Sequence, residues 1–409
     1  MMCLAGLAGR STSRHWITLL IGLLVLAPAT LLAEPWQRHT IDDSSRGADG
    51  IRLADANGDG RLDIATGWEQ GGIVRVYLQP AGEKVKQAWP AVTVGTVGSP
   101  EDAVLADLDN DGRLDVISCC EGQVRTIFVH WAPAESDRYL DPGAWTTAPL
   151  PVTENKQSWM YAVPGQLDGR HGPDLLVGSK GQAATVGWLQ SPANPRQLGQ
   201  WQFHPLYKAG WIMSLVSHDI DRDGDLDVIV SDRKGPSRGV FWLEHPGQER
   251  VAGRWLEHRI GGAGLEVMFI DVGLLDGDKH ADILVATRNK ELLAFFRQAG
   301  KEVSWRSEQI PNPFGVPHGK AVLIADIDGD GRADIVHDAN THGDRSRPGV
   351  AWLSQDKNGR WQPHDLSGMQ GVKFDLLRAV DLDRDGDLDI LGCEEADNLG
   401  VFWYENPAR

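Results

Sequence analysis

Five loops of the chain carry an aspartate or asparagine at every other position and a glycine at the sixth position. The pattern is D-x-[DN]-x-D-G-x-x-D, as in DLDRDGDLD from Asp381. Positions 1, 3 and 5 present side-chain oxygens, position 7 can offer its backbone carbonyl, and position 9 adds a carboxylate, while glycine allows the sharp turn. Carboxylates this close repel one another unless a cation lies among them. The pattern therefore predicts a metal site in each of the five loops.

The ligand chemistry favours calcium as the metal. Ligation by oxygen alone, with several carboxylates, suits Ca²⁺ better than Mg²⁺, which prefers fewer protein ligands and more water. A plain Asp-Gly hairpin turn would need only one acid and one glycine. An EF-hand is excluded, because these loops lack the glutamate that it requires at position 12. The predicted ligands are Asp55, Asn57, Asp59, Asp63, Asp107, Asp109, Asp111, Asp115, Asp219, Asp221, Asp223, Asp227, Asp326, Asp328, Asp330, Asp334, Asp381, Asp383, Asp385 and Asp389.

Two further loops are degenerate copies of this pattern. QLDGRHGPD has Gln166 first and Arg170 at position 5. We expect a fixed cation to replace the metal in this third loop. LLDGDKHAD has Leu274 first and Lys279 where the glycine belongs, so we expect weak metal binding or none in this fifth loop.

The seven loops divide the chain into modules of similar size, since their first positions are residues 55, 107, 166, 219, 274, 326 and 381. Each module has four short segments rich in Val, Ile and aromatic residues, bounded by Gly, Pro and Asp, which is typical of strands. Four strands repeated seven times predict an all-β fold, a seven-bladed β-propeller of four-stranded blades. The first strand, residues 36–41, is expected to complete the last blade beside residues 400–406.

The repeats also resemble a known family. GQLDGRHGPDLLVGS, residues 165–179, is similar to the loop and following strand of the FG-GAP/VCBS repeat, whose best-known members are the seven-bladed propellers of integrin α-subunits. The resemblance implies Ca²⁺ in the loop between the first two strands of a blade. Similar repeats occur in secreted sugar-active propellers, including rhamnogalacturonan lyases and aldos-2-ulose dehydratase. The fold thus leaves the function open.

The N-terminus is expected to be removed. Arg10 and Arg14 precede an apolar run, and small residues follow up to Ala33, so residues 1–33 predict a secretory signal peptide. An uncleaved anchor fits less well, because the run is short and Pro28 breaks it. The mature chain would be one propeller domain, residues 34–409, secreted or periplasmic, with no membrane span.

The net charge limits the kinds of binding partner, and the cysteine content argues against a disulfide-stabilised fold. The formal charge of −17 becomes −19 once the two arginines of the signal peptide are removed with no acid. Such a charge argues against nucleic acid or an anionic membrane surface as partner. The three remaining cysteines, Cys119, Cys120 and Cys393, are too few and too irregular for a disulfide framework.

A ligand site is expected on the face opposite the calcium loops. Trp68, Trp159 and Trp211 fall in connections on that face and could stack on sugar rings or anchor a protein. The alternative is that they plug the channel as core residues.

Acidic and basic residues on that face also fall in different blades. The positions compared are the residue six before the first position of each loop and the residue six after its last position. The acids fall in blades seven, one and two, while Lys180, Arg233 and Arg288 fall in blades three to five. A mouth with opposite signs suits a polar or zwitterionic ligand, although ordinary solvated loop ends would look the same. The fourteen positions hold Asp49, Glu101, Met160, Met213, Met268, Lys320 and Asp375 before the loops, and Glu69, Glu121, Lys180, Arg233, Arg288, Asn340 and Glu395 after them.

Two functions remain open. We expect a secreted, calcium-binding module for carbohydrate or an extracellular protein, with Trp68, Trp159, Trp211, Lys180, Arg233 and Arg288 at its ligand site. The alternative is a sugar-active enzyme, a polysaccharide lyase or dehydratase, with its site in the same mouth. There Lys180, Arg233 or Arg288 would hold a carboxylate, and His318, His337 and Lys320 in blade six are the candidate catalytic residues. Their spacing matches no tight motif, so surface or core histidines are an equally simple interpretation.

Overall fold

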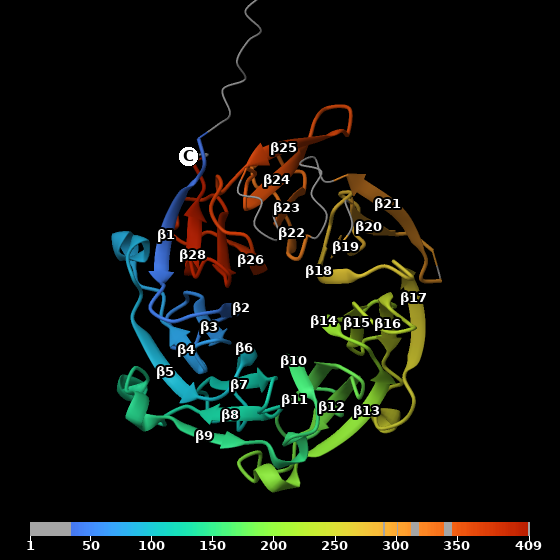
Figure 1. Cartoon of the computed structure of the whole chain (residues 1–409). Coiled ribbons are helices and arrows are strands. Elements are labelled where there is room, and N and C mark those ends of the chain that lie inside the picture. The colour runs from blue at the N-terminus through green and yellow to red at the C-terminus, as the bar shows by residue number, and fades with distance from the viewer. Residues whose placement is uncertain (1–33, 289–290, 301, 312–318, 339–345, 408–409) are drawn as a thin grey trace, which may run out of the picture. The chain divides into compact units, whose positions relative to one another are not determined.

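Seven four-stranded antiparallel sheets stand in a ring in the computed structural model (Figure 1). The structure describes residues 34–288, 291–300, 302–311, 319–338 and 346–407, and within these ranges it contains 28 strands. The predicted seven-bladed propeller is confirmed. The innermost strands are β2 (Ala48–Ala54), β6 (Pro100–Ala106), β10 (Ser158–Gly165), β14 (Ile212–His218), β18 (Val267–Gly273), β22 (Val322–Ala325) and β26 (Phe374–Val380).

The other three strands of each blade follow outward in chain order. The second strands are β3 (Asp63–Trp68), β7 (Asp115–Cys120), β11 (Asp174–Lys180), β15 (Asp227–Asp232), β19 (Asp282–Thr287), β23 (Asp334–Asp338) and β27 (Asp389–Glu394). The third strands are β4 (Ile73–Tyr77), β8 (Ile127–Trp131), β12 (Thr185–Gln190), β16 (Gly239–Glu244), β20 (Glu291–Arg297), β24 (Val350–Gln355) and β28 (Gly400–Glu405). The outer strands are β5 (Ala91–Thr96), β9 (Thr146–Pro149), β13 (Gln202–Lys208), β17 (Leu256–Gly261), β21 (Trp305–Pro311), β25 (Trp361–Asp365) and, from the N-terminus, β1 (Gln37–Asp42).

Helical structure is limited to short 3-10 turns in the connections. None of the helices in the described ranges is long and apolar enough to cross a membrane. The turns are η1 (Gly82–Lys86), η2 (Ser136–Arg138), η3 (Pro142–Ala144), η4 (Pro151–Thr153), η5 (Leu198–Gln200) and η6 (Gln248–Arg250).

The N-terminal strand closes the ring. β1 pairs antiparallel with β28, so the last sheet has the order β1-β28-β27-β26 and joins both ends of the propeller (Figure 1). The ring of His39 in β1 lies 4.5 Å from the ring of Trp403 in β28, and its Nε2 atom lies 2.6 Å from Glu405 Oε2. The expected closure is confirmed, and it removes the free edge that β28 would otherwise expose.

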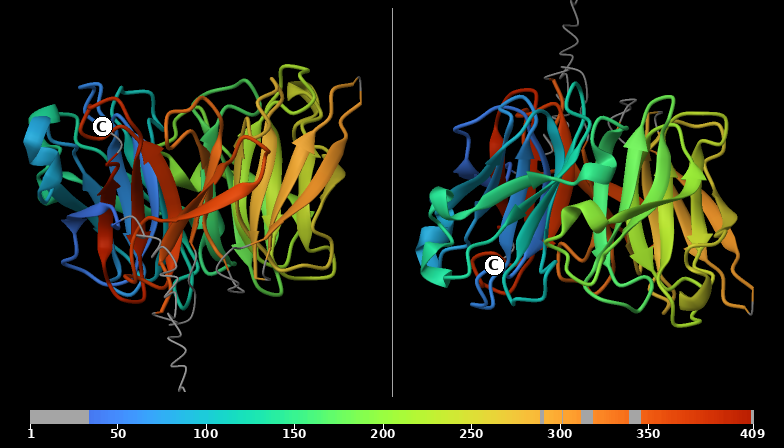
Figure 2. Two further views of the ribbon diagram at one scale, coloured as in Figure 1. Left: turned by 90° about the horizontal axis from the view of Figure 1, so that it is seen from above. Right: turned by 90° about the horizontal axis from the view of Figure 1, so that it is seen from below.

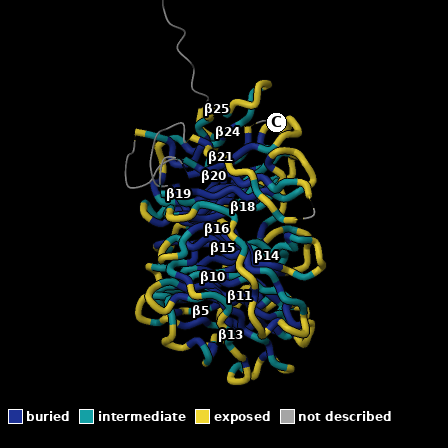
Figure 3. The backbone as a smooth tube through the Cα atoms, turned by 90° about the vertical axis from the view of Figure 1, so that its right-hand side faces the viewer, coloured by how far each residue is buried: buried dark blue, intermediate teal, exposed yellow. Residues whose placement is uncertain are grey.

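Packing between blades forms the core. The blades stand side by side around the ring (Figure 2). A neighbouring blade therefore covers each face of a second strand, and these strands are buried at almost every residue, whereas exposed residues gather in the loops (Figure 3). Ala65 and Val76 of the first blade, for example, share an apolar cluster with Ala103 and Val116 of the second. Burial on both faces explains why these strands are continuously apolar instead of alternating.

A buried aspartate fixes each loop to its blade. Every second strand begins at the ninth residue of its loop. Asp63, for instance, accepts hydrogen bonds from Ala56 N at 2.9 Å and from Gln79 N at 2.8 Å, where Gln79 follows the third strand. The degenerate third loop keeps the same two contacts, from Leu167 N and Ser191 N to Asp174. The ninth residue therefore joins loop and blade even where the predicted metal ligands are missing.

The histidines of the outer strands are structural, as their repetition predicted. Each stacks on a tryptophan of the neighbouring third strand. The pairs are His39 with Trp403, His204 with Trp188, His258 with Trp242 and His364 with Trp352, at ring-centroid distances of 4.0 to 4.6 Å.

Deleting residues 34–42 should destabilise the propeller, because the backbone edge of β28 would lose its partner. We expect a large drop in melting temperature or aggregation, measured by thermal unfolding and light scattering. Asp43→Ala, an exposed residue just after β1, is the matched control and should melt like the wild type. An unchanged melting temperature in the deletion variant would contradict closure by β1.

Candidate functional site

The complete loops fit a cation. In the first loop Asp55 Oδ2 accepts a hydrogen bond from Gly60 N at 2.8 Å, which folds the loop around its first carboxylate. The other oxygens of the first aspartates in three loops, Oδ1 of Asp219, Asp326 and Asp381, are buried and have no hydrogen-bond partner in the described part of the chain. A buried carboxylate oxygen without a partner is unfavourable unless an ion binds it.

Carboxylates from different loop positions also converge. Oxygens within 4.8 Å of one another come from the groups Asp107, Asp109 and Asp111; Asp219, Asp221 and Asp227; and Asp326, Asp328 and Asp334. Several acidic clusters in these loops can therefore hold a metal ion. Some of these carboxylates contact a cationic side chain, since Arg196 pairs with Asp109 and Asp111. Other loop carboxylates do the same, as Arg61 pairs with Asp59 and Arg332 with Asp330.

The fourth loop position carries a constraint that the sequence pattern did not reveal. All seven residues there have φ between 58° and 77°, the left-handed region. Glycine or asparagine, which tolerate this conformation, occupy five of these positions, so their enrichment was the available signal. The residues are Gly58, Asn110, Gly169, Arg222, Gly277, Gly329 and Arg384.

The third loop differs from the expectation that a fixed cation replaces a metal there. The amide of Gln166, and not the guanidinium of Arg170, donates to the loop carbonyls. Gln166 Nε2 lies 2.9 Å from the carbonyl oxygen of Arg170 and 3.2 Å from that of Gly172, at position 7. The neutral amide at position 1 thus donates a hydrogen bond to the carbonyl at position 7, which in the complete loops is predicted to face a cation. In the fifth loop, Leu274 is 52% exposed and offers no oxygen.

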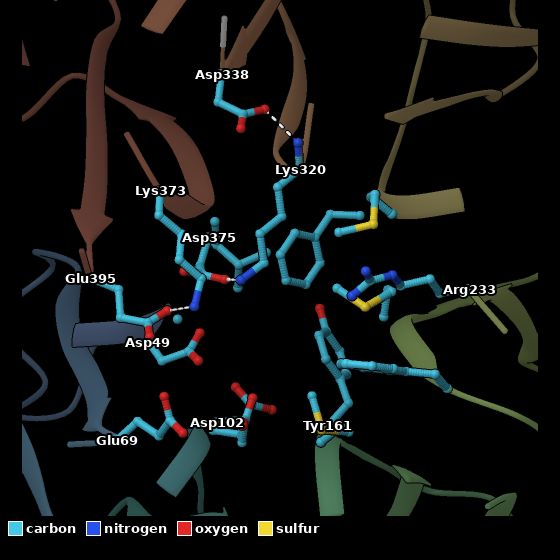
Figure 4. Close-up of a pocket in the computed structure, with 18 of the residues that line it drawn as sticks. Asp49, Glu69, Asp102, Tyr161, Arg233, Lys320, Asp338, Lys373, Asp375 and Glu395 are labelled. Atoms are coloured by element: carbon cyan, nitrogen blue, oxygen red, sulfur yellow. Dashed lines mark hydrogen bonds and ion pairs between the residues drawn. The ribbon is translucent and has the colours of Figure 1, made fainter. Parts of the chain in front are cut away.

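A cavity of about 680 Å³ lies at the opposite ends of the same strands (Figure 4). Its lining includes thirteen of the fourteen positions that the sequence placed six residues from each loop. The fourteenth, Asn340, lies outside the described residues. The fixed length of the first and second strands explains this agreement, because each strand starts or ends at its loop.

The basic side of the cavity is built around one carboxylate and one indole. Arg233 Nε lies 3.1 Å and Arg288 Nε 3.6 Å from Glu266 Oε2, so two guanidinium groups share a single acid. The guanidinium of Arg233 also lies 4.4 Å from the ring of Trp211, and Lys180 Nζ lies 4.7 Å from it. Burial and the charge of Arg233 lower the pKa of Arg288.

The acidic side is partly neutralised by lysines. Lys320 pairs with Asp375 and Lys373 with Glu395, while Lys180 reaches across to Glu101 at 3.3 Å. Burial raises the pKa of Glu101, whereas burial lowers the pKa of Lys320. Positive and negative side chains are therefore less separated around the cavity than the sequence positions suggested.

Bulges in the inner strands shape the cavity further. Strict alternation would turn neighbouring residues to opposite faces, yet Met160 and Tyr161 both line the cavity, as do Met268 and Phe269. The pairing of the first and second strands shifts register at these points. Such bulges re-aim side chains, which is why the sequence analysis missed Tyr161 and Phe269.

Comparison with known proteins agrees with the repeat structure. The model of the FG-GAP-like repeat matches residues 55–118 and 275–337. The chain carries FG-GAP-like repeats in these two segments. Both segments run from a loop into the second strand of the next blade.

Solved structures support the same fold. Two crystal structures of BBS1N in complex with ARL6DN, soaked with lead and with mercury, contain a chain similar to this one, with TM-scores of 0.54 and 0.50. In both, the alignment covers 91% of this chain and 97% of that chain at 10% identity. These likenesses show the fold alone. No curated protein sequence matched the chain.

Only one of the three predicted tryptophans lines the cavity. Trp211 does so, and its side chain is half-buried. Trp68 is completely buried and its Nε1 donates to Tyr77 OH at 2.9 Å, while Trp159 is 1% exposed and donates to the Thr153 carbonyl at 3.2 Å. The prediction of a ligand-binding role is wrong for Trp68 and Trp159, because neighbouring strands cover both side chains.

The predicted catalytic residues are not gathered in the cavity. His337 is completely buried, its Nδ1 lies 3.0 Å from the Asp338 carbonyl oxygen, and burial lowers its pKa to about 4. Among the residues that the structure describes, no histidine lines the cavity. His318 lies outside those residues. Lys320 does line the cavity, where it pairs with Asp375.

Truncating Trp68 should cost far more stability than truncating Trp211. Trp68→Ala removes a fully buried side chain and should lower the free energy of unfolding by about 3–5 kcal/mol. Trp211→Ala should lower it by clearly less, because its ring borders the open cavity. Denaturant unfolding of both variants measures the difference. Equal losses would mean that Trp211 is also a core residue.

Proposed function

We propose that the protein is a secreted, calcium-stabilised propeller that binds an anionic carbohydrate in the cavity opposite the calcium loops. The observation that carries the proposal is the cavity itself, to which all seven blades contribute side chains. Its volume of about 680 Å³ lies within the range of about 300–1,000 Å³ typical of small-ligand pockets. An extracellular protein partner would be expected to use a flatter or more apolar surface.

The basic side supports an acidic ligand. Arg233 and Arg288 both contact Glu266, so two guanidinium groups lie close together on this side of the cavity. A ligand carboxylate can pair with the two guanidinium groups, which are the preferred partners of planar anions. The charge-lined walls around apolar Met160, Met213 and Met268 suit a sugar acid, whose ring is amphipathic and whose substituents are polar.

Calcium supports the scaffold on the other face. The unpartnered carboxylate oxygens and converging acids of the complete loops are the observations that favour an ion there. Five ions would add ten positive charges to the expected mature charge of −19. Their role in this proposal is to stabilise the ring and hold the strand ends, since they lie away from the cavity.

Export is the third part of the proposal and rests on the N-terminal sequence. The first 33 residues lie outside the described part of the chain. N-terminal sequencing of the protein recovered from a periplasmic or culture fraction tests this directly, and we expect Glu34 as the first residue.

Replacing Arg233 and Arg288 together with alanine should weaken ligand binding by at least tenfold and leave the melting temperature nearly unchanged. A glycan array with acidic and matched neutral oligosaccharides identifies the ligand, and calorimetry measures its affinity for each variant. Arg360→Ala, an exposed arginine that pairs with Asp356, is the control and should bind like the wild type. Equal affinity of wild type and double variant, or preference for neutral glycans, would contradict the proposal.

Removing calcium should lower the melting temperature steeply. Ions that bind only the folded ring stabilise it by about 2.7 kcal/mol per site at a hundredfold excess over the dissociation constant. Asp385→Ala should remove one equivalent of bound calcium, measured by equilibrium dialysis, whereas Arg170→Ala in the degenerate third loop should remove none. A melting temperature that does not respond to chelator would show that the aspartates only form turns.

A further inference from the structure

Three carboxylates from two neighbouring blades meet inside the cavity, away from the calcium loops. Asp49 lies in β2, Glu69 follows β3, and Glu101 lies in β6. Each offers an oxygen, and the three oxygens lie within 4.8 Å of one another. None of the three belongs to the aspartate pattern of the loops.

The neighbouring carboxylates have cationic partners, whereas this group is only partly neutralised. Lys320 pairs with Asp375, Lys373 with Glu395, and Lys180 with Glu121. Within the group only Glu101 has an ion pair in the described part of the chain, with Lys180 at 3.3 Å.

Asp49 points independently to a missing partner. Asp49 is only 6% exposed, and its carboxylate faces the cavity beside Glu69 and Glu395 (Figure 4). No hydrogen bond or ion pair joins this carboxylate to another residue in the described ranges, although the charges of Lys320, Lys373 and Lys180 act on it. A buried carboxylate is unfavourable without direct contacts, so Asp49 lacks the direct partner that a bound cation would supply.

We propose that Asp49, Glu69 and Glu101 bind a divalent cation at the channel mouth, separate from the loop calcium. Three carboxylates and no nitrogen or sulfur donor favour a hard ion such as Ca²⁺ or Mn²⁺. Water from the cavity would complete its coordination. The site goes beyond the proposed carbohydrate binding, because the ion would bind in the absence of carbohydrate.

The test compares bound metal in matched variants of the full chain. Asp49→Asn with Glu69→Gln removes two of the three carboxylates at nearly constant volume. Equilibrium dialysis against Ca²⁺ alone, repeated with Mn²⁺ alone, should show one fewer ion per chain in this double variant than in the wild type. Because only the difference is used, the result does not depend on how many loops bind calcium.

Glu266→Gln is the matched control, since it removes a carboxylate that pairs with Arg233 and Arg288 and should keep the wild-type number of ions. Glu69→Gln alone, at a less buried position, takes the place of the double variant if that variant fails to fold, and should weaken one ion at least tenfold. Equal stoichiometry and affinity in wild type and mouth variants, with both metals, would overturn the proposal. Loss of carbohydrate binding in the arginine variants has no bearing on this outcome.

Discussion

The buried aspartate that ends each loop is the contact on which every blade depends. Its carboxylate accepts a backbone N–H from the loop and, in six blades, another from the last residue of the third strand or from the chain just after it, as Asp227 does with Ile220 and His245. Burying this acid is tolerated because backbone donors satisfy its oxygens. The two bonds join three segments of the chain without requiring any particular partner side chain. This explains why the aspartate is present even where Gln166 or Leu274 stands in place of the first aspartate of the pattern.

The second strand that begins at this aspartate spans the distance between the two faces of the propeller. The strand has about six residues, and at roughly 3.3 Å per residue its other end lies about 20 Å away. Asp227 thus stands at the loop face and Arg233, just past the strand, at the cavity. Changes in the loops therefore act on stability, whereas changes at the strand ends act on the cavity. Degenerate loops can coexist with a complete cavity for the same reason.

The positions of the cavity residues were predictable, but their environment was not. Lys180, Arg233 and Arg288 lie on one wall because each follows a second strand of similar length that begins at the end of its loop, and the repeat gives both the strand length and the loop position. Whether an aromatic residue is free depends instead on the neighbouring blade, which buries Trp68 and leaves part of Trp211 open. Ion pairs such as that between Lys320 and Asp375 join different blades, and no local pattern reports them.

The sequence by itself determined the number of blades, the strand order, the closure by β1 and the loops able to bind a cation. Each of these follows from local periodicity or from ligand types at fixed spacing, which survive any change in the surroundings. Only the tertiary structure decided that Gln166 and not Arg170 fills the third loop, and that Tyr161 and Phe269 reach the cavity. It also brought Asp49, Glu69 and Glu101 together. These features arise from bulges and from contacts between blades, where distances in space are unrelated to distances along the chain.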